Sequence, residues 1–261
     1  MFYEKYLKAT KEKGSYININ LDPALPKQRK ENVVPERYVS KEDSESLLNF
    51  SLDIIEQVSD YCCSIKPNTQ YYLGHTDILK KIAKKSHDHG MLAILDHKLS
   101  DIGSTNSSAI YWIKEMGFDA FTFSPFAGNT QKTVEKAHEN NLGVIVLTLM
   151  SNPEAEKMMI NTTVNDQPYY MYTAKTVKET EADGCVVGLT CFVEDEYIKN
   201  IQKVVGDKVV FLLQGMGPQG GQANKIRYAR NPLVSLGRAV IYSDNPRKNV
   251  KRYHDIFKKY M

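Results

Sequence analysis

The sequence has few of the features that mark disulfide-rich, membrane or secreted proteins. Only 4 of its 261 residues are cysteine, with neither a CxxC pair nor the spacing of a small secreted domain. The longest apolar run, LGVIVLTLM, is too short to cross a bilayer, which takes about 20 residues. The N-terminal stretch MFYEKYLKATKEKG is charged and lacks the apolar segment of a secretory signal. We therefore expect a cytoplasmic protein with reduced thiols and no membrane contact.

Signals for nucleic acid, metal and dinucleotide binding are also absent. The 34 basic and 31 acidic residues leave a net charge of only +3, and the basic residues are scattered. His87 and His89 stand two apart on a predicted helix, so they do not share a face as metal ligands would. The segment GMGPQGG lacks the strand–helix context and the acidic residue of a dinucleotide fingerprint. We expect no nucleic-acid partner, no metal and no cofactor.

What the sequence does contain is a regular alternation of strand-like and helix-like segments. Several of the apolar runs are nearly continuous, which is typical of parallel strands covered by helices on one side and by a core on the other. Eight such runs occur, at 15–22, 61–68, 91–98, 120–125, 142–149, 185–190, 209–214 and 232–238. Amphipathic segments separate them, which predicts a (β/α)8 TIM barrel and leaves a doubly wound open sheet as the alternative. We expect residues 1–261 to form one barrel domain, with an N-terminal helix covering the barrel floor.

Charged residues gather where the predicted strands end. Four of the eight strand ends carry them: Asp22, Lys66, Asp96 with Lys98, and Arg238. Residues 96 and 98 are two apart on a strand, so both side chains should point into the barrel mouth, while His97 should face the helices. Solvated turns would be a simpler explanation for one charged end. Opposite charges interleaved at four ends instead indicate a site at the carboxyl ends of the strands, where barrel enzymes place theirs.

A glycine-rich segment follows the seventh predicted strand. LLQGMGPQGGQANKIRYA contains four glycines and a proline ahead of a short helix, so its backbone N–H groups could converge on an anion. Arg238, at the end of the next strand, would add a bidentate donor. Barrels often bind phosphate between the loops after strands seven and eight. Together with the charged strand ends, this predicts proton or carbanion chemistry on a small phosphorylated molecule, with a lysine as the acid.

These residues resemble the orotidine 5′-monophosphate decarboxylase family. The most specific match is Asp96-x-Lys98-x-x-Asp101-Ile102, with Thr105 three positions further on. Supporting matches, in chain order, are NLDP at 20–23, IKPN at 65–68, LTLMSNPEA at 147–155, PQGG at 218–221 and LGRAVIYSDNP at 236–246. The resemblance implies cofactor-independent decarboxylation of orotidine 5′-monophosphate to uridine 5′-monophosphate, a lyase step of pyrimidine biosynthesis.

The resemblance also implies a role for each matching residue. Lys98 would stabilise and protonate the carbanion at C6, beside Asp96 near the substrate carboxylate. Asp22 and Lys66 would hold the ribose hydroxyls, and Lys66 would complete the alternating charge network. The remaining substrate contacts would be Ser151 to the pyrimidine, and Gln219, Gly237 and Arg238 to the phosphate, with backbone amides near Gly220 and Gly221.

In this family the residues after the third strand serve a neighbouring subunit. Asp101 and Thr105 would reach into the partner's site, with Ile102 as a further substrate contact, which implies a homodimer with shared active sites.

Two other functions are compatible with parts of the pattern. Magnesium-dependent sugar-phosphate decarboxylases and aldolases of the same barrel group share the Asp-x-Lys-x-x-Asp motif, but they need a carboxylate where this chain has Lys66. A non-catalytic nucleotide sensor would keep PQGG and Arg238 and lose the Asp–Lys–Asp set, which is complete here.

Overall fold

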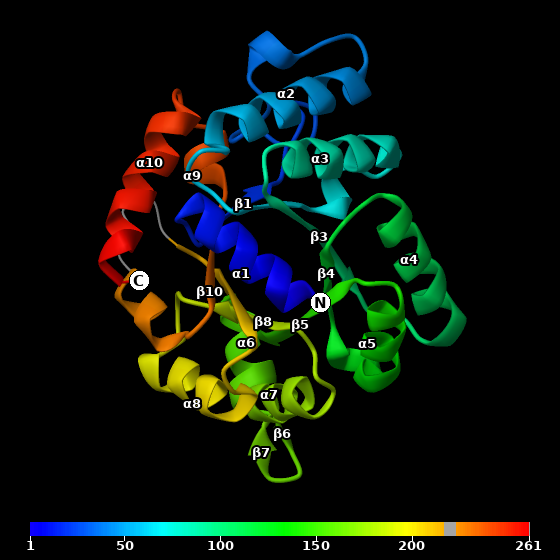
Figure 1. The fold of residues 1–261 in the computed structure, drawn as a ribbon, viewed down its shortest axis with the longest axis vertical. Helices are drawn as coiled ribbons and strands as arrows, with labels where there is room; N and C mark the ends of the chain where they lie inside the picture. Colours follow the sequence, from blue (N-terminus) through cyan, green and yellow to red (C-terminus); the bar gives the residue numbers. More distant parts are fainter. Residues whose placement is uncertain (217–222, 261) are drawn as a thin grey trace.

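A closed barrel of parallel strands forms the centre of the molecule (Figure 1). The structure is a computed structural model that describes residues 1–216 and 223–260. The barrel strands are β1 (Ile17–Leu21), β2 (Ser64–Pro67), β3 (Leu92–Leu99), β4 (Ala120–Phe123), β5 (Gly143–Leu149), β8 (Gly184–Gly188), β9 (Val210–Gln214) and β10 (Pro232–Leu236). They close in the order β1, β10, β9, β8, β5, β4, β3, β2. The predicted (β/α)8 barrel is confirmed with all eight strands, and the open-sheet alternative is wrong.

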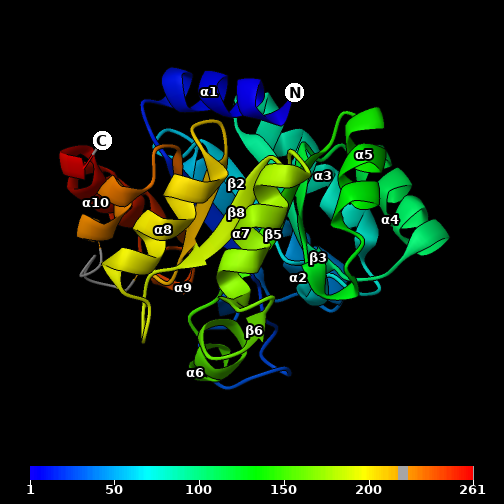
Figure 2. The same ribbon diagram turned by 90° about the horizontal axis from the view of Figure 1, so that it is seen from below.

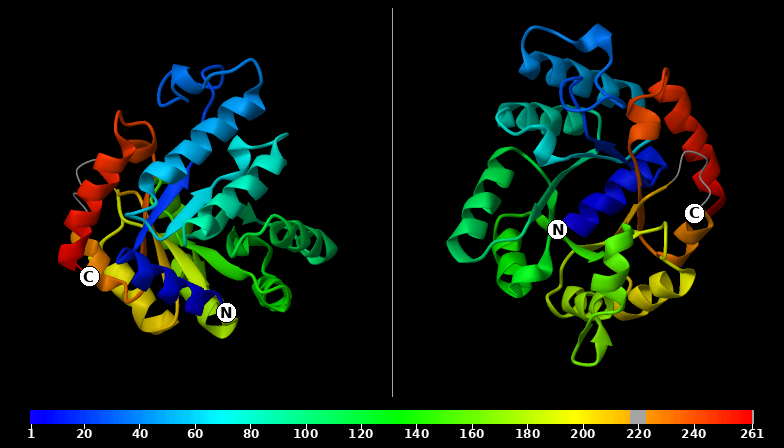
Figure 3. Two further views of the ribbon diagram at one scale, coloured as in Figure 1. Left: turned by 45° about the horizontal axis from the view of Figure 1, so that its top comes forward. Right: turned by 180° about the vertical axis from the view of Figure 1, so that it is seen from behind.

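Helices surround the strands on the outside (Figure 3). The α-helices are α1 (Phe2–Lys13), α2 (Asp43–Val58), α3 (Thr76–Asp88), α4 (Gly103–Glu115), α5 (Thr130–Glu139), α6 (Pro153–Ala155), α7 (Tyr169–Glu179), α8 (Asp195–Val205), α9 (Arg238–Ile241) and α10 (Pro246–Phe257). Their apolar residues recur every three to four positions and face the barrel, as Phe50, Ile54 and Val58 do on α2. In the described part of the chain, no helix combines the length and apolar character that a membrane span requires.

The apolar core has two parts that meet different elements. The larger part fills the layer between the strands and the outer helices. The smaller part lies inside the lower barrel, where Ile94, Ile145 and Leu212 meet Phe2 and Tyr6 of α1. The Tyr6 hydroxyl also donates to the Pro232 carbonyl at 2.9 Å. Helix α1 therefore closes the N-terminal end of the barrel, as predicted, and Figure 2 shows it across that end.

Longer segments gather at the opposite end of the barrel (Figure 2). The segment after β1 packs back onto the barrel through Arg29, whose guanidinium lies 5.8 Å from the ring centre of Tyr71 and 5.6 Å from that of Tyr242. The segment after β5 contains α6, a π-helical turn (Glu156–Ile160) and a small hairpin of β6 (Thr163–Val164) with β7 (Gln167–Pro168). The sequence analysis did not predict this hairpin, because two-residue strands leave no periodic pattern.

Two aspartates at the N-terminal end of the barrel join neighbouring elements in the same way. Asp119 accepts the Ala93 backbone N–H at 3.0 Å and binds Nε2 of His87 at 2.8 Å. Asp183 accepts the Val144 N–H at 2.9 Å and binds Nε2 of His138 at 2.9 Å. The hydrogen bond to the aspartate raises the pKa of each histidine above its ordinary value, and it outweighs partial burial, which lowers the pKa.

These two pairs predict a pH-dependent part of the stability. A histidine whose pKa is raised by folding stabilises the folded state, and this stabilisation is complete below the unfolded-state pKa of about 6.5. The stabilisation is lost as the pH rises through the folded-state pKa. His138→Asn should therefore lower the free energy of unfolding by about 0.5 kcal/mol more at pH 5.5 than at pH 9, a small difference because the side chain is partly exposed. His87→Asn should behave alike, as measured by thermal unfolding at both pH values. An equal loss at both would contradict the assignment.

Candidate active site

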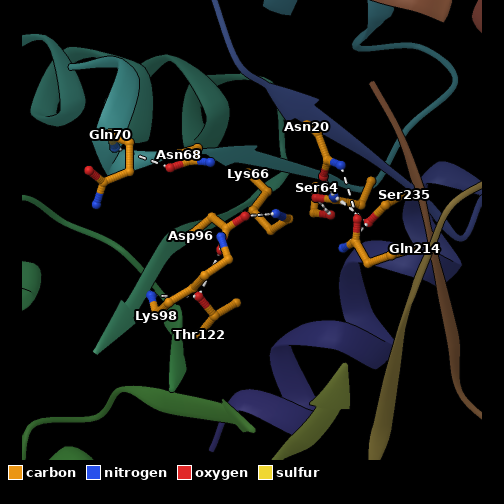
Figure 4. A network of polar contacts seen from close by, with 11 residues as sticks. Asn20, Ser64, Lys66, Asn68, Gln70, Asp96, Lys98, Thr122, Gln214 and Ser235 are labelled. Carbon is orange, nitrogen blue, oxygen red and sulfur yellow. Dashed lines mark hydrogen bonds and ion pairs between the residues drawn. The ribbon is translucent and has the colours of Figure 1, made fainter. Parts of the chain in front are cut away.

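Two lysines and one aspartate form a charged cluster at the carboxyl ends of β2 and β3 (Figure 4). Lys66 makes an ion pair with Oδ2 of Asp96, and Nζ of Lys98 lies 2.7 Å from Oδ1 of the same carboxylate. The Lys66 side chain is 3% exposed and that of Lys98 is 41% exposed. One oxygen of Asp96 therefore binds the buried Lys66 ammonium, and the other binds the partly exposed Lys98 ammonium.

The two ammonium groups determine the charge of Asp96. Burial alone would raise the pKa of this carboxyl, but the fields and hydrogen bonds of Lys66 and Lys98 outweigh burial and hold the pKa far below its ordinary value. Asp96 is thus ionised at neutral pH. The cluster therefore places a buried carboxylate between a buried lysine and a partly exposed one.

Asp22, directly after β1, contributes a carboxylate with an unused oxygen. Its Oδ1 is buried and has no hydrogen-bond partner in the described part of the chain. Burial raises the pKa of Asp22 above its ordinary value, although Lys66 acts in the opposite direction. A buried oxygen without a partner is costly in a folded protein, so Asp22 is suited to accept a hydrogen bond from a ligand.

Two adjoining cavities open at this end of the barrel, and Asn20 and Asp22 border both. The first, about 360 Å³, contains the charged cluster and is also lined by Ser151. The second, about 720 Å³, is lined by Gly237 and Arg238. An elongated ligand could therefore place one end at the cluster, its middle at Asp22 and its other end at Arg238.

The structure brings together most of the residues predicted for one site. Asp22, Lys66, Asp96, Lys98, Ser151, Gly237 and Arg238 all border the two cavities. Gln219, Gly220 and Gly221 lie outside the described residues. The helix predicted after the glycine-rich segment is a 3-10 helix (Ala223–Tyr228).

Three predicted residues lie outside these two cavities of their own chain. Asp101, Ile102 and Thr105 are exposed at the start of α4, and Ile102 is 61% exposed. Among the described residues, the Asp101 carboxylate accepts a local hydrogen bond from the Ile102 N–H at 2.7 Å. Within a single chain these side chains are available to another molecule and do not border either cavity.

His97 faces away from the charged cluster, as predicted. Its Nδ1 lies 3.2 Å from Oγ1 of Thr69, and it lines a separate space between α3 and α4. Burial lowers the pKa of His97 below its ordinary value, against the field of Asp96. The alternation expected for Asp96, His97 and Lys98 therefore holds, even though β3 is irregular here and Lys98 has a φ of 52°.

A layer of uncharged polar side chains, several of which line the two cavities, was not predicted from the sequence (Figure 4). Asn20 donates to Gln214 at 3.1 Å, and Gln214 donates to Ser235 at 2.9 Å. Asn18 donates to Ser235 at 3.0 Å and accepts from Ser64 at 2.8 Å. The signal was the alternation of Ile and Asn in ININ at 17–20, which marks one polar face of the first strand.

Within the described residues, no group of three or more His, Cys, Asp or Glu side chains is arranged to hold a metal ion. The charges of the site come instead from lysines, arginine and isolated carboxylates.

Comparison with known proteins identifies similar sequences. The model of the Orotidine 5′-phosphate decarboxylase / HUMPS family matches residues 43–253. A protein named orotidine 5′-phosphate decarboxylase from Cellvibrio japonicus is 30% identical over 260 residues, covering 94% of this chain and 90% of its own length. One of the same name from Herpetosiphon aurantiacus is 29% identical over 256 residues, with coverage of 93% and 90%.

Solved structures share the fold. Leishmania donovani OMP decarboxylase has a TM-score of 0.81 at 18% identity, covering 99% of this chain and 98% of its own. Orotidine 5′-monophosphate decarboxylase from Methanocaldococcus jannaschii, complexed with the inhibitor BMP, has a TM-score of 0.70 at 24% identity, with coverage of 92% and 97%. At these identities the likeness supports the barrel fold.

The close approach of Gly188 to Ser151 predicts a stability effect that is independent of any ligand. A Cβ atom on Gly188 would lie 2.4 Å from Cβ of Ser151, closer than atoms can pack. Gly188→Ala should cost about 1–3 kcal/mol through overpacking, a loss of several degrees in melting temperature. Ser151→Gly in the same chain should restore part of it, because it removes the Cβ and Oγ atoms and leaves the backbone N of residue 151, at 2.9 Å, as the remaining close contact. Additive losses in the double variant would show that the two positions are not in contact.

Proposed function

The chain belongs to the orotidine 5′-phosphate decarboxylase family, and on that basis we propose that it converts orotidine 5′-monophosphate to uridine 5′-monophosphate, a step of pyrimidine biosynthesis. The observation that carries the proposal is the Lys66–Asp96–Lys98 cluster at the bottom of a cavity. This arrangement suits a reaction in which negative charge develops on carbon beside a fixed ammonium group.

Lys98 is the proposed acid. In the reaction the bond between C6 and the carboxyl carbon breaks, carbon dioxide leaves, and the electron pair remains on C6. A proton then passes from Nζ of Lys98 to C6, and the neutral amine regains a proton from water. At about 4 Å and an effective dielectric constant near 20, one such charge contact is worth roughly 4 kcal/mol, or about three powers of ten in rate if it forms only in the transition state.

Asp96 and Lys66 are proposed to position the Lys98 ammonium before the reaction begins. Asp96 keeps Nζ of Lys98 near the carboxylate end of the cavity before the substrate enters, so no reorganisation is needed when charge develops. The ionised Asp96 also lies where the substrate carboxylate would bind, and Lys66 offsets part of the repulsion.

The rest of the substrate is proposed to bind along the two cavities. The free Asp22 oxygen, together with Lys66, suits the ribose hydroxyls, and Ser151 suits the pyrimidine. Arg238, with the Gly237 backbone N–H and Gln219, is proposed for the phosphate. Binding energy from this remote group can be used at the reacting carbon.

A homodimer with shared sites is part of the proposal. Asp101, Ile102 and Thr105 are exposed on one chain, as residues that serve a neighbour's cavity would be before assembly. We also propose a cytoplasmic location, which fits the absence of disulfide bonds among Cys62, Cys63, Cys185 and Cys191.

The magnesium-dependent alternative is not supported. Such enzymes would need a carboxylate at the end of the second strand, and this chain has Lys66 there, buried and paired with Asp96. No described cluster supplies the acidic ligands that magnesium would require.

The proposed reaction predicts turnover that does not depend on an added metal. The purified protein should remove the near-ultraviolet absorbance of orotidine 5′-monophosphate, with the same rate in EDTA and in magnesium. Lys98→Ala should lower kcat by at least about a thousandfold, because it removes both the charge and the proton. Equal melting temperatures would show that the variant is folded. No turnover by the wild type, or activity only with magnesium, would contradict the proposed function.

The shared site predicts that two inactive variants restore each other. Each site would use Lys98 of its own chain and Asp101 of the partner, so co-expressed Lys98→Ala and Asp101→Ala chains should regain about a quarter of wild-type activity through hybrid dimers. The matched control is Lys98→Ala with Asp96→Ala: both residues serve their own chain, so this pair should stay inactive. No recovery in the first pair would count against a shared site.

A further inference from the structure

The Thr122 hydroxyl bridges two residues of the charged cluster, Asp96 and Lys98 (Figure 4). Thr122 lies in β4 and is 1% exposed. Its Oγ1 donates to Oδ1 of Asp96 at 2.9 Å and accepts the backbone N–H of Lys98 at 2.9 Å. One hydroxyl therefore uses both its donor and an acceptor lone pair, and it touches the Asp96 side chain and the Lys98 backbone at once.

The Lys98 backbone needs such a partner because its conformation is unfavourable. Its φ of 52° lies in the left-handed region, which is unfavourable for a residue with a Cβ atom. The pairing of β3 with β4 shifts register between Leu95 and Leu99, so Lys98 is outside the regular ladder. Its N–H is instead satisfied by the Thr122 side chain, and the strained turn directs the ammonium back onto Asp96.

The hydrogen bond from Thr122 to Asp96 restrains the carboxylate that binds the Lys98 ammonium. Oδ1 of Asp96 receives both Nζ of Lys98 at 2.7 Å and the Thr122 hydroxyl at 2.9 Å, while Oδ2 receives Lys66. Every direction in which the carboxylate could rotate would break at least one of these bonds. Thr122 thus restrains both the position of the carboxylate and the backbone that carries the ammonium.

We propose that Thr122 is a positioning residue that acts through Lys98 and Asp96, holding the Lys98 ammonium at the reacting carbon. This inference rests on the proposed decarboxylation. Without the hydroxyl, the Lys98 N–H and one oxygen site of Asp96 lose their partner, and Lys98 can relax toward ordinary extended backbone. Such a change would move the ammonium, while Asp22 and Arg238, which are proposed to bind the ribose and phosphate, stay in place.

The test compares side chains of nearly equal volume with and without the hydroxyl. Thr122→Val should lower kcat about 10- to 100-fold, because misplacing a reacting group by about 1 Å costs that much in rate. KM and the affinity for uridine 5′-monophosphate should stay within about threefold of the wild-type values. Thr122→Ser keeps the hydroxyl and should recover most of kcat. The matched control is Thr173→Val on α7, a buried threonine whose hydroxyl donates to the Tyr169 carbonyl at 3.0 Å, and it should leave kcat unchanged.

Several outcomes would overturn the proposal. They are wild-type kcat in Thr122→Val, no recovery in Thr122→Ser, or an equal loss in the Thr173→Val control. A loss of uridine 5′-monophosphate binding alongside kcat would also overturn it, because that would indicate general damage. If Thr122→Val does not fold, Thr122→Ser against Thr122→Ala gives the same comparison.

A crystal structure of the variant tests the inference without turnover. In Thr122→Val the Lys98 φ should leave the left-handed region and its Nζ should move away from Asp96. An unchanged Lys98 would overturn the inference whatever the reaction is. A wild type that does not decarboxylate the substrate would contradict the proposed function, whereas normal turnover in Thr122→Val would contradict only the role of Thr122.

Discussion

The buried ion pair between Lys66 and Asp96 is the interaction on which the rest of the site depends. An ammonium that is 3% exposed would be very costly without a partner, and Asp96 supplies one across the β2–β3 pairing. In return, Lys66 helps to keep Asp96 ionised despite its burial. A charged Asp96 can then hold the more exposed Lys98 above it. Removing either member of the buried pair would leave an uncompensated charge inside the barrel and release the ammonium that faces the cavity.

The barrel provides the two environments that this ion pair requires. At its N-terminal end, α1 and the apolar side chains around Phe2 and Tyr6 exclude water and close the interior. Above them, the layer from Asn18 to Gln214 bonds internally, so its polar atoms are satisfied before any ligand binds. Near the carboxyl ends lie the paired charges of Lys66, Asp96 and Lys98, together with the Asp22 oxygen that has no partner among the described residues. The lower barrel and the outer helices bury the apolar core, whereas the left-handed Lys98 lies at the cavity.

Much of the fold and part of the site could be predicted from the sequence. The eight strands were identifiable because apolar runs in a parallel barrel are long and regularly spaced. Asp22, Lys66, Asp96, Lys98 and Arg238 were identifiable because parallel strands bring their carboxyl ends to the same edge of the sheet. Thr122 was missed because a lone threonine in an apolar strand carries no periodic signal, and its role depends on a register shift in the neighbouring strand. The short hairpin of β6 and β7 was missed for a related reason, since two-residue pairings arise from local tertiary packing.

The sequence by itself determined the order of the eight barrel strands, the charges at four of their ends and the family of the chain, because these follow from local periodicity and from motifs within single segments. Only the tertiary structure decided which oxygen of Asp96 meets which lysine, and that one Asp22 oxygen has no partner among the described residues. It also decided that the Lys98 backbone is left-handed and held by Thr122. Such features depend on the register between strands and on the barrel curvature. A hydrogen bond forms or fails over a few tenths of an ångström, and the spacing of residues along the chain does not specify distances between strands at that scale.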